Sequence, residues 1–428
     1  MESNTSHHAT ETHLLLEALQ GALGPSAVFC GADIPERNQN DYSGLQPSPP
    51  LAVVRPADTA GGAAALRICH AHGVPVVPQG GMTGLCGGAR AAPDQVALSL
   101  ERLVGIEELD AAAATMTVLA GTPLETIQQA AASAGFFCPL DLGARGSCAI
   151  GGNLATNAGG NRVIRYGMAR EMVLGIEVVL PDGTVVTSLN KMIKNNAGFD
   201  LKHLFIGSEG TLGVITRVVL KLFAQPASTM VAVCALRSYA DVLALLSSAR
   251  QNLGPLLSAF EVMWPDYWRF AMRHAPGMRN PFPGDENDYG AYVLVEALGT
   301  DPVQDAPRFE RWLEGLMETG AVPNAALAQS LADGKAFWRI HDASGELHPV
   351  WPQHLAFDVG LPVARMDEYV SRCRQALQAQ LPGVQSLFYG HIGDGNLHII
   401  VYQPGADPQP NDRVNALVYG LARDYGGT

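Results

Sequence analysis

The chain has 428 residues, of which 47% are hydrophobic and 16% charged, so it is globular and too long for one ordinary core. Its formal net charge is −13 and its Lys and Arg residues form no cluster, which argues against a nucleic-acid partner. Seven scattered cysteines without Cys-x-x-Cys spacing favour reduced thiols and a cytoplasmic location over disulfides or a thiolate metal site. No apolar stretch approaches about 18 residues, so we expect no membrane span.

Helices and short strands alternate through the first half of the chain, which is typical of a mixed helix and sheet domain. The expected elements are a helix over 11–23, a strand over 51–54, a helix over 58–72, strands over 74–77, 96–100 and 115–119, a helix from Pro123 to Gly135, a hairpin over 172–188 and a strand over 213–223. Gln225-Pro226 follows the last strand, and we place a domain boundary there.

A second α+β layer with its own core is expected beyond this boundary. Its elements are a first helix, strands over 258–264, 291–298 and 354–362, helices over 305–319 and 366–380, a strand pair over 385–402 and a final helix. We therefore expect an N-terminal extension (1–50), a first domain (51–225) and a second domain (226–428).

Three glycine-rich loops fall in the first domain: VVPQGGMTGLCGG (76–88), PLDLGARGSCAIGGNLATNAGGNR (139–162) and IGSEGTLGVIT (206–216). Consecutive glycines let backbone N–H groups approach an anion closely. The first loop is no P-loop, because no Gly-Lys-Ser/Thr follows, and no dinucleotide turn, because no helix starts there. Asn153, Thr156 and Asn157 can hydrogen-bond to phosphate, ribose or a flavin edge. The loops indicate a large polyanionic cofactor; the alternative is three unrelated tight connections.

These loops, together with RYG (165–167) and GHIGDGNLH (390–398), resemble in order and spacing the FAD-linked D-2-hydroxy acid dehydrogenases of the vanillyl-alcohol-oxidase fold. Among these, the chain looks closest to D-2-hydroxyglutarate, D-lactate and glycolate dehydrogenases. The resemblance implies an α+β fold with a two-part FAD-binding domain of the PCMH type and an α+β substrate (cap) domain. It implies non-covalent FAD, since no His stands at the loop positions that carry a covalent flavin link in related oxidases.

The resemblance also assigns the FAD-binding residues, and Met82 stands where the family commonly has Asn. The assigned residues are Pro78, Gln79, Gly80, Gly81, Met82, Thr83, Gly84, Pro139, Asp141, Leu142, Ser147, Ile150, Gly151, Gly152, Asn153, Thr156, Asn157, Gly159, Gly210, Gly213 and Ile215.

A second chemical signal is the pair of histidines in QSLFYGHIGDGNLHIIVY (385–402). Asp394-Gly395 is a favoured two-residue hairpin turn, and with that turn His391 pairs with His398 at a Cβ separation of about 5 Å. Two imidazoles so placed can share a Zn²⁺, although two surface histidines of a hairpin give the same pattern. The resemblance implies that both bind a divalent metal, zinc by preference, and that Asn396 helps position the substrate.

The resembling enzymes supply a Glu as third metal ligand and a His as base just after a Gly-Gly-Thr segment. The sequence ends at Gly426-Gly427-Thr428. We expect a shortened sequence here rather than a loss of these two residues.

An acidic substrate needs a cation, and the fork of an Arg matches a carboxylate. The resemblance assigns this role to Arg339. Enzymes specific for 2-hydroxyglutarate tend to have Lys where this chain has Ala356, and His354, on the same strand face, is a weak substitute. The substrate within the class therefore stays open.

The function implied is oxidation of a small D-2-hydroxy acid to the 2-oxo acid, with hydride transfer to flavin N5. Electrons would then pass to a separate acceptor, such as a quinone, a cytochrome or an electron-transfer flavoprotein, and a homodimer is compatible with the sequence. Three alternatives stay open: an oxidase that uses oxygen, a UDP-sugar reductase of the same flavin fold, and a non-catalytic FAD-binding subunit.

Overall fold

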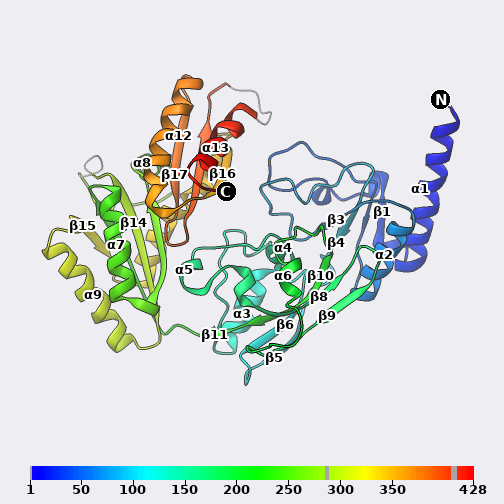
Figure 1. Ribbon diagram of the computed structural model, residues 1–428, viewed down its shortest axis with the longest axis horizontal. Helices are drawn as coiled ribbons and strands as arrows, with labels where there is room; N and C mark the ends of the chain where they lie inside the picture. Colours follow the sequence, from blue (N-terminus) through cyan, green and yellow to red (C-terminus); the bar gives the residue numbers. More distant parts are fainter. Residues whose placement is uncertain (1, 285–288, 406–411) are drawn as a thin grey trace. The chain divides into compact units, whose positions relative to one another are not determined.

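A computed structural model describes residues 2–284, 289–405 and 412–428. The chain divides into two compact units, Met1–Gly160 with Gly167–Gln225, and Asn161–Tyr166 with Pro226–Thr428. The short segment Asn161–Tyr166 thus belongs to the second unit, although the sequence on either side of it belongs to the first (Figure 1).

The first unit begins with a four-stranded sheet of order β1-β2-β4-β3, in which β2, β4 and β3 are parallel and β1 is antiparallel. The strands are β1 (Val28–Cys30), β2 (Ala52–Val54), β3 (Val76–Gln79) and β4 (Val96–Ser99). Helix α1 (Glu2–Leu23) packs against α2 (Thr59–Ala71) and buries Leu15 and Leu19. The residues treated above as an N-terminal extension are therefore part of the first unit.

A second, antiparallel sheet of order β5-β6-β10-β8-β9 carries most of the glycine-rich loops. Its strands are β5 (Ile106–Asp110), β6 (Thr115–Leu119), β8 (Val173–Val179), β9 (Val185–Ser188) and β10 (Val214–Lys221). Helix α3 (Leu124–Ser133) precedes the second loop, which contains the short helix α4 (Ile150–Ala155), and a small sheet pairs β7 (Phe136–Phe137) with β11 (Phe223–Ala224).

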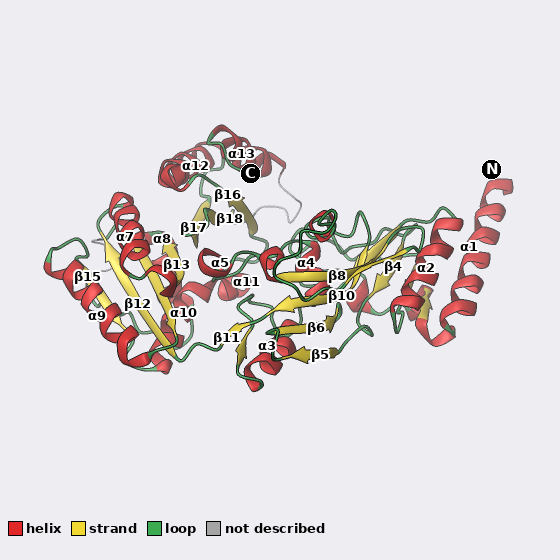
Figure 2. Cartoon of the chain, turned by 60° about the horizontal axis from the view of Figure 1, so that its bottom comes forward, coloured by secondary structure: helices red, strands yellow, loops and turns green. Residues whose placement is uncertain are grey.

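The second unit is a seven-stranded antiparallel sheet of order β15-β12-β14-β13-β17-β18-β16. The strands are β12 (Ser228–Leu236), β13 (Leu257–Met263), β14 (Ala291–Gly299), β15 (Asn324–Leu327), β16 (Leu355–Gly360), β17 (Gln385–His391) and β18 (Asn396–Tyr402). Figure 2 shows helices on both sides of this sheet.

Helices cover both faces of this sheet, so alternate strand residues feed two separate cores. On β14, Val293 and Val295 enter one core while Tyr292 and Leu294 enter the other. The helices α7 (Tyr239–Asn252), α9 (Pro302–Glu318), α12 (Met366–Gln380) and α13 (Asp412–Asp424) cover the first face, and α8 (Pro265–His274), α10 (Leu331–His341) and α11 (Leu347–Val350) cover the second.

Because helices cover both faces of this sheet, one strand was not recognised in the sequence, and this is the main error of the expected secondary structure. We expected a helix directly after the boundary, whereas the chain first forms β12 and only then α7. The run STMVAVCAL is apolar on both faces, as a strand buried on both sides must be, and therefore shows no alternation.

Segment Asn161–Tyr166 is held in the second unit by a buried ion pair. The Glu296 carboxylate on β14, 2% exposed, accepts hydrogen bonds from Arg162 Nε at 3.0 Å, Ser258 Oγ at 2.8 Å and Trp338 Nε1 at 3.0 Å. The Arg165 guanidinium adds a bond to the Leu298 carbonyl at 2.5 Å. A buried carboxylate needs such partners, because its desolvation is costly.

We predict that Arg162→Leu lowers the free energy of unfolding by about 3–5 kcal/mol, because it leaves the Glu296 charge buried without a cation. The double variant Arg162→Leu/Glu296→Gln should recover most of this loss. Urea unfolding followed by tryptophan fluorescence measures the effect, since all five tryptophans lie in the second unit. A loss below about 1 kcal/mol for the single variant contradicts the assignment.

Candidate active site

Several glycines of the predicted cofactor loops are required by close backbone packing. A Cβ on Gly81 would lie 2.1 Å from the Ser147 carbonyl oxygen, and a Cβ on Gly151 would lie 2.7 Å from the Ala120 Cβ. The first and second loops therefore pack together backbone to backbone, which only glycine permits.

Other glycines of these loops face open space. A Cβ on Gly143 would meet no heavy atom within 4 Å, one on Gly84 would meet only the Asp41 carboxylate at 3.8 Å, and one on Gly152 only the Gly80 Cα at 4.0 Å. Unshielded backbone of this kind can approach a phosphate closely. The loops therefore offer the kind of exposed backbone that binding the phosphates of a dinucleotide cofactor requires.

Each of the three loops holds one non-glycine residue in the left-handed region: Met82 (φ 59°), Asn157 (φ 49°) and Glu209 (φ 53°). This conformation costs a bulky residue such as Met more than it costs Asn, and such strain clusters at ligand-binding sites. Met82 is nevertheless buried, at 7% exposure. The Asn expected from the family would fit the same backbone with less strain.

The first and third loops meet at a pocket of about 330 Å³. Pro78, Gly210 and Gly213 line this pocket together with His70 and Val179. A Cβ on Gly210 would lie 2.8 Å from the Pro78 Cγ, so the third loop lies directly on the first. That Gly210 and Gly213 bind FAD stays a prediction.

Some predicted FAD residues hold the loops in place instead of offering a free side chain. The Gln79 amide, fully buried, bonds to Asn38 and to the Ala89 carbonyl. Ile150 and Ile215 are buried in the core, at 1% and 5% exposure. The part played by each residue in binding stays a prediction.

In the second unit, four neighbouring strands carry a row of two histidines flanked by two carboxylates. Glu261 on β13 is the direct cross-strand neighbour of His391 on β17, and Asp358 on β16 is that of His398 on β18. The Nε2 atoms of the two histidines lie 3.2 Å apart. Each Nδ1 faces a carboxylate instead, at 2.6 Å from Glu261 Oε2 for His391 and at 3.5 Å from Asp358 Oδ2 for His398.

The predicted pairing register of the hairpin is wrong by two residues. His398 pairs with Tyr389, not with His391, because the strands end at His391 and Asn396 and leave a longer turn. A shift of two preserves the face on which each side chain points, since strand side chains alternate with a period of two. The two histidines therefore still meet, as diagonal neighbours.

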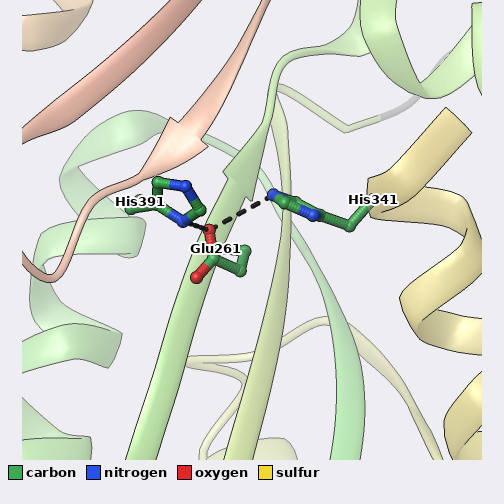
Figure 3. A group of neighbouring side chains, drawn as sticks. All are labelled: Glu261, His341 and His391. Carbon is green, nitrogen blue, oxygen red and sulfur yellow. Dashed lines mark ion pairs between the residues drawn. The ribbon is translucent and has the colours of Figure 1, made fainter. Parts of the chain in front are cut away.

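Sequence reasoning missed Glu261 and His341, which lie beside His391 (Figure 3). The Oε2 atom of Glu261 is 3.3 Å from His341 Nε2, and the three residues could offer ligand atoms within 4.8 Å of one another. Glu261 Oε2, His341 Nε2 and His391 Nδ1 are buried, and none has a well-aligned hydrogen bond among the described residues. A Glu within the apolar strand LSAFEVM was the available signal, because a buried charge requires a partner.

The electrostatics of this row are set by burial and by the neighbouring charges. Burial by itself raises the pKa of Glu261, but the imidazoles of His391 and His341 outweigh it and lower that pKa to about 2. Burial lowers the pKa of His341, but the carboxylates of Asp342 and Glu261 raise it to about 9. Burial lowers the pKa of His398 to about 3, and the charges of His391 and His341 act in the same direction. His398 is therefore neutral at pH 7, which is the form that binds a metal.

The two residues predicted to contact substrate lie differently. Asn396 begins β18 in the hairpin itself, and its backbone N–H donates to Asp394 Oδ1 at 3.1 Å. Arg339 is exposed on α10, whereas His341, two residues later, is buried. Two residues correspond to about 200° around a helix, so the two side chains leave α10 on opposite sides. The structure does not bring Arg339 into the Glu261–His391 group.

Comparisons with known proteins agree with the division of the chain into two units. Residues 50–188 match the family described as FAD binding domain, and residues 225–428 match the family described as FAD linked oxidases, C-terminal domain. Among solved structures, an alkyldihydroxyacetonephosphate synthase covers 97% of this chain and 80% of its own at a TM-score of 0.78 and 16% identity. The match to p-cresol methylhydroxylase covers 98% of this chain and 88% of that protein, at a TM-score of 0.77 and 15% identity. The expected fold class is confirmed, and the chain is an FAD-linked oxidoreductase.

Relatives narrow this class. A probable D-2-hydroxyglutarate dehydrogenase of Oryza sativa subsp. indica is 38% identical over 397 residues, which cover 93% of this chain and 70% of the relative. A D-2-hydroxyglutarate dehydrogenase of Xanthomonas citri pv. viticola is 37% identical over 384 residues, which cover 89% of this chain and 79% of that relative. The Arabidopsis thaliana relative is 38% identical, and the match spans only 61% of its length. The chain belongs to the D-2-hydroxyglutarate dehydrogenase family of FAD-dependent enzymes that act on CH–OH groups.

The predicted cytoplasmic location is wrong as it stands. The rice and Arabidopsis relatives are named mitochondrial, whereas the Xanthomonas relative is bacterial. Reduced thiols indicate a reducing compartment, and this does not distinguish between these locations. In the described part of the chain, none of the helices combines the length and the apolarity that crossing a membrane requires.

We predict that the metal-free protein loses stability as pH rises from about 6.5 to about 9. A raised histidine pKa contributes stability that is complete below the unfolded value of 6.5 and is lost as pH rises through the folded value, about 9 for His341. Glu261→Gln should make this decline shallower, whereas the exposed Glu310→Gln should not. Urea unfolding between pH 6 and pH 10 measures the free energy of unfolding as a function of pH. If this free energy declines equally steeply in both variants, the ion pair between Glu261 and His341 is contradicted.

Proposed function

We propose that the chain oxidises a small D-2-hydroxy acid, such as D-2-hydroxyglutarate or D-lactate, to the 2-oxo acid with non-covalent FAD and a divalent metal ion. The observation that carries the proposal is the row of Glu261, His391, His398 and Asp358, in which two Nε2 atoms converge while each Nδ1 faces a carboxylate. Metal-binding histidines have this arrangement, with one nitrogen on the ion and the other held by a carboxylate.

The distances favour the two Nε2 atoms as the ligands. Two ligands at the usual zinc–nitrogen distance and a tetrahedral angle lie roughly 3.3 Å apart. The two Nε2 atoms are 3.2 Å apart and meet this requirement. Glu261 Oε2 and His391 Nδ1, at 2.6 Å, are too close to be neighbouring ligands of one tetrahedral ion and fit an ion-pair contact instead.

Each residue of the row then has a defined task. Glu261 keeps a proton on His391 Nδ1 and so leaves the Nε2 lone pair free, and Asp358 does the same for His398 at the longer distance of 3.5 Å. His341 offsets the buried charge of Glu261. When bound, the ion would supply Lewis-acid polarisation of the 2-hydroxyl and carboxylate of the substrate, and FAD would supply the hydride acceptor.

Substrate recognition rests on residues that the resemblance assigns. We propose that Asn396 positions the substrate beside the two histidines. Arg339, to which the resemblance assigns the substrate carboxylate, is exposed on the side of α10 opposite His341, so its contact with the substrate would lie away from the Glu261–His391 group. The half-buried His354, whose Nδ1 lies 2.8 Å from the Trp351 carbonyl oxygen, precedes the exposed Ala356 on β16. The electrons leave the reduced flavin for a separate acceptor, a quinone, a cytochrome or an electron-transfer flavoprotein.

The reaction is tested by anaerobic mixing of the FAD-loaded, zinc-loaded protein with D-2-hydroxyglutarate, D-lactate, D-malate and glycolate. At least one of these acids should bleach the flavin absorbance, and the L-isomers of the chiral acids should not. A yellow protein that none of the acids bleaches contradicts the proposal and favours a non-catalytic FAD-binding subunit. Peroxide release on admission of air would identify an oxidase instead.

A further inference from the structure

The second unit contains a cavity of about 300 Å³ that the proposed reaction does not use. It lies between α8, α12 and the start of β17. Phe270 and Leu387 contribute apolar surface, and Arg269, Arg273 and Arg374 contribute three guanidinium groups. A volume of this size suits a small organic molecule.

The cavity is separate from the histidine row. It reaches Gln385, Ser386 and Leu387 at the first end of β17, whereas His391 ends that strand. From Leu387, the lining residue of β17 nearest to His391, the strand still spans about 13 Å to His391 at the usual rise per residue. A ligand of this cavity is therefore no part of the site described above.

The charge of the cavity is opposite to that of the chain. Among the described residues that line it, Asp266 is the one acid, so these residues carry an excess of two positive charges in a protein of net charge −13. Arg269 and Arg273 are four residues apart on α8, where like charges repel each other across one helix turn. A bound anion would remove this repulsion.

Two of the arginines are held in fixed positions. Asp266 pairs with Arg374 at 2.7 Å through one carboxylate oxygen and with Arg269 through the other. The Arg374 guanidinium also lies 5.1 Å from the centre of the Phe388 ring. Its Nε is buried and has no hydrogen-bond partner among the described residues. The Asp266 ion pair and the Phe388 ring thus hold the Arg374 side chain, which lines the cavity, in place.

We propose that this cavity binds a small organic dianion, either a phosphate monoester or a dicarboxylate. The guanidinium forks match both head groups, and the excess of two positive charges matches a dianion. Arg273 supplies a solvent-exposed contact, while Arg374 supplies one that is held by Asp266. The inference concerns binding alone and is independent of the proposed reaction.

Isothermal titration calorimetry of the FAD-loaded protein tests the proposal, with adenosine monophosphate and glutarate as probes and adenosine as the uncharged control. At least one dianion should bind in a 1:1 ratio while adenosine does not, and the probe that binds identifies the head group. Arg273→Glu should weaken this binding about tenfold or more, because a charge-assisted hydrogen bond is lost and repulsion is added.

The matched control is Arg279→Glu, which makes the same charge change at an exposed residue outside the cavity lining. It should leave the affinity unchanged within about twofold, since distant surface charges are screened by salt. Flavin content and tryptophan fluorescence establish that both variants are folded. Failure of both dianions to bind at about 1 mM, or equal binding by the two variants, overturns the proposal.

Discussion

The second unit depends on a carboxylate buried in the middle of a sheet. Glu261 is 1% exposed, and its charge is tolerated because His391 and His341 lie against the same oxygen. Removing such a charge from water is costly unless partners compensate for it, so Glu261 fixes where both imidazoles must lie. With His391 Nδ1 turned to Glu261, its Nε2 faces His398 at 3.2 Å. The geometry of the candidate metal site therefore follows from one ion-pair group.

The two units position their candidate binding residues by different means. In the first, glycines bring backbone segments within contact distance, and one strained residue in each loop shows that the loops are held against local preference. In the second, antiparallel pairing sets Glu261 opposite His391 and Asp358 opposite His398, so the side chains are aligned by the strand ladder. Sites carried on rigid strands keep their geometry better than sites on free loops.

Much of this was predictable from the sequence, but only where the signal is local. The helix over 366–380, the strand over 115–119 and the hairpin around Pro181-Asp182-Gly183 follow from periodicity and turn residues, and the structure confirms them. The pairing of the two histidines on one face was predicted, although the register was not, because the length of a turn depends on its tertiary surroundings. Glu261 and His341 are 130 and 50 residues away from His391 in sequence, and only the sheet order brings them together. The segment Asn161–Tyr166 gave no sequence signal that it belongs to the second unit.

The most direct test of the central claim is X-ray absorption spectroscopy at the zinc edge of the zinc-loaded protein, compared with His391→Ala and Glu261→Gln. The account predicts two imidazole nitrogens at about 2.0–2.1 Å, loss of the ion but not of FAD in His391→Ala, and a metal affinity about 10–100-fold weaker in Glu261→Gln. A spectrum with one imidazole whose carboxylate ligand disappears in Glu261→Gln would instead place the ion between Glu261 and His391 Nδ1, and would contradict the account.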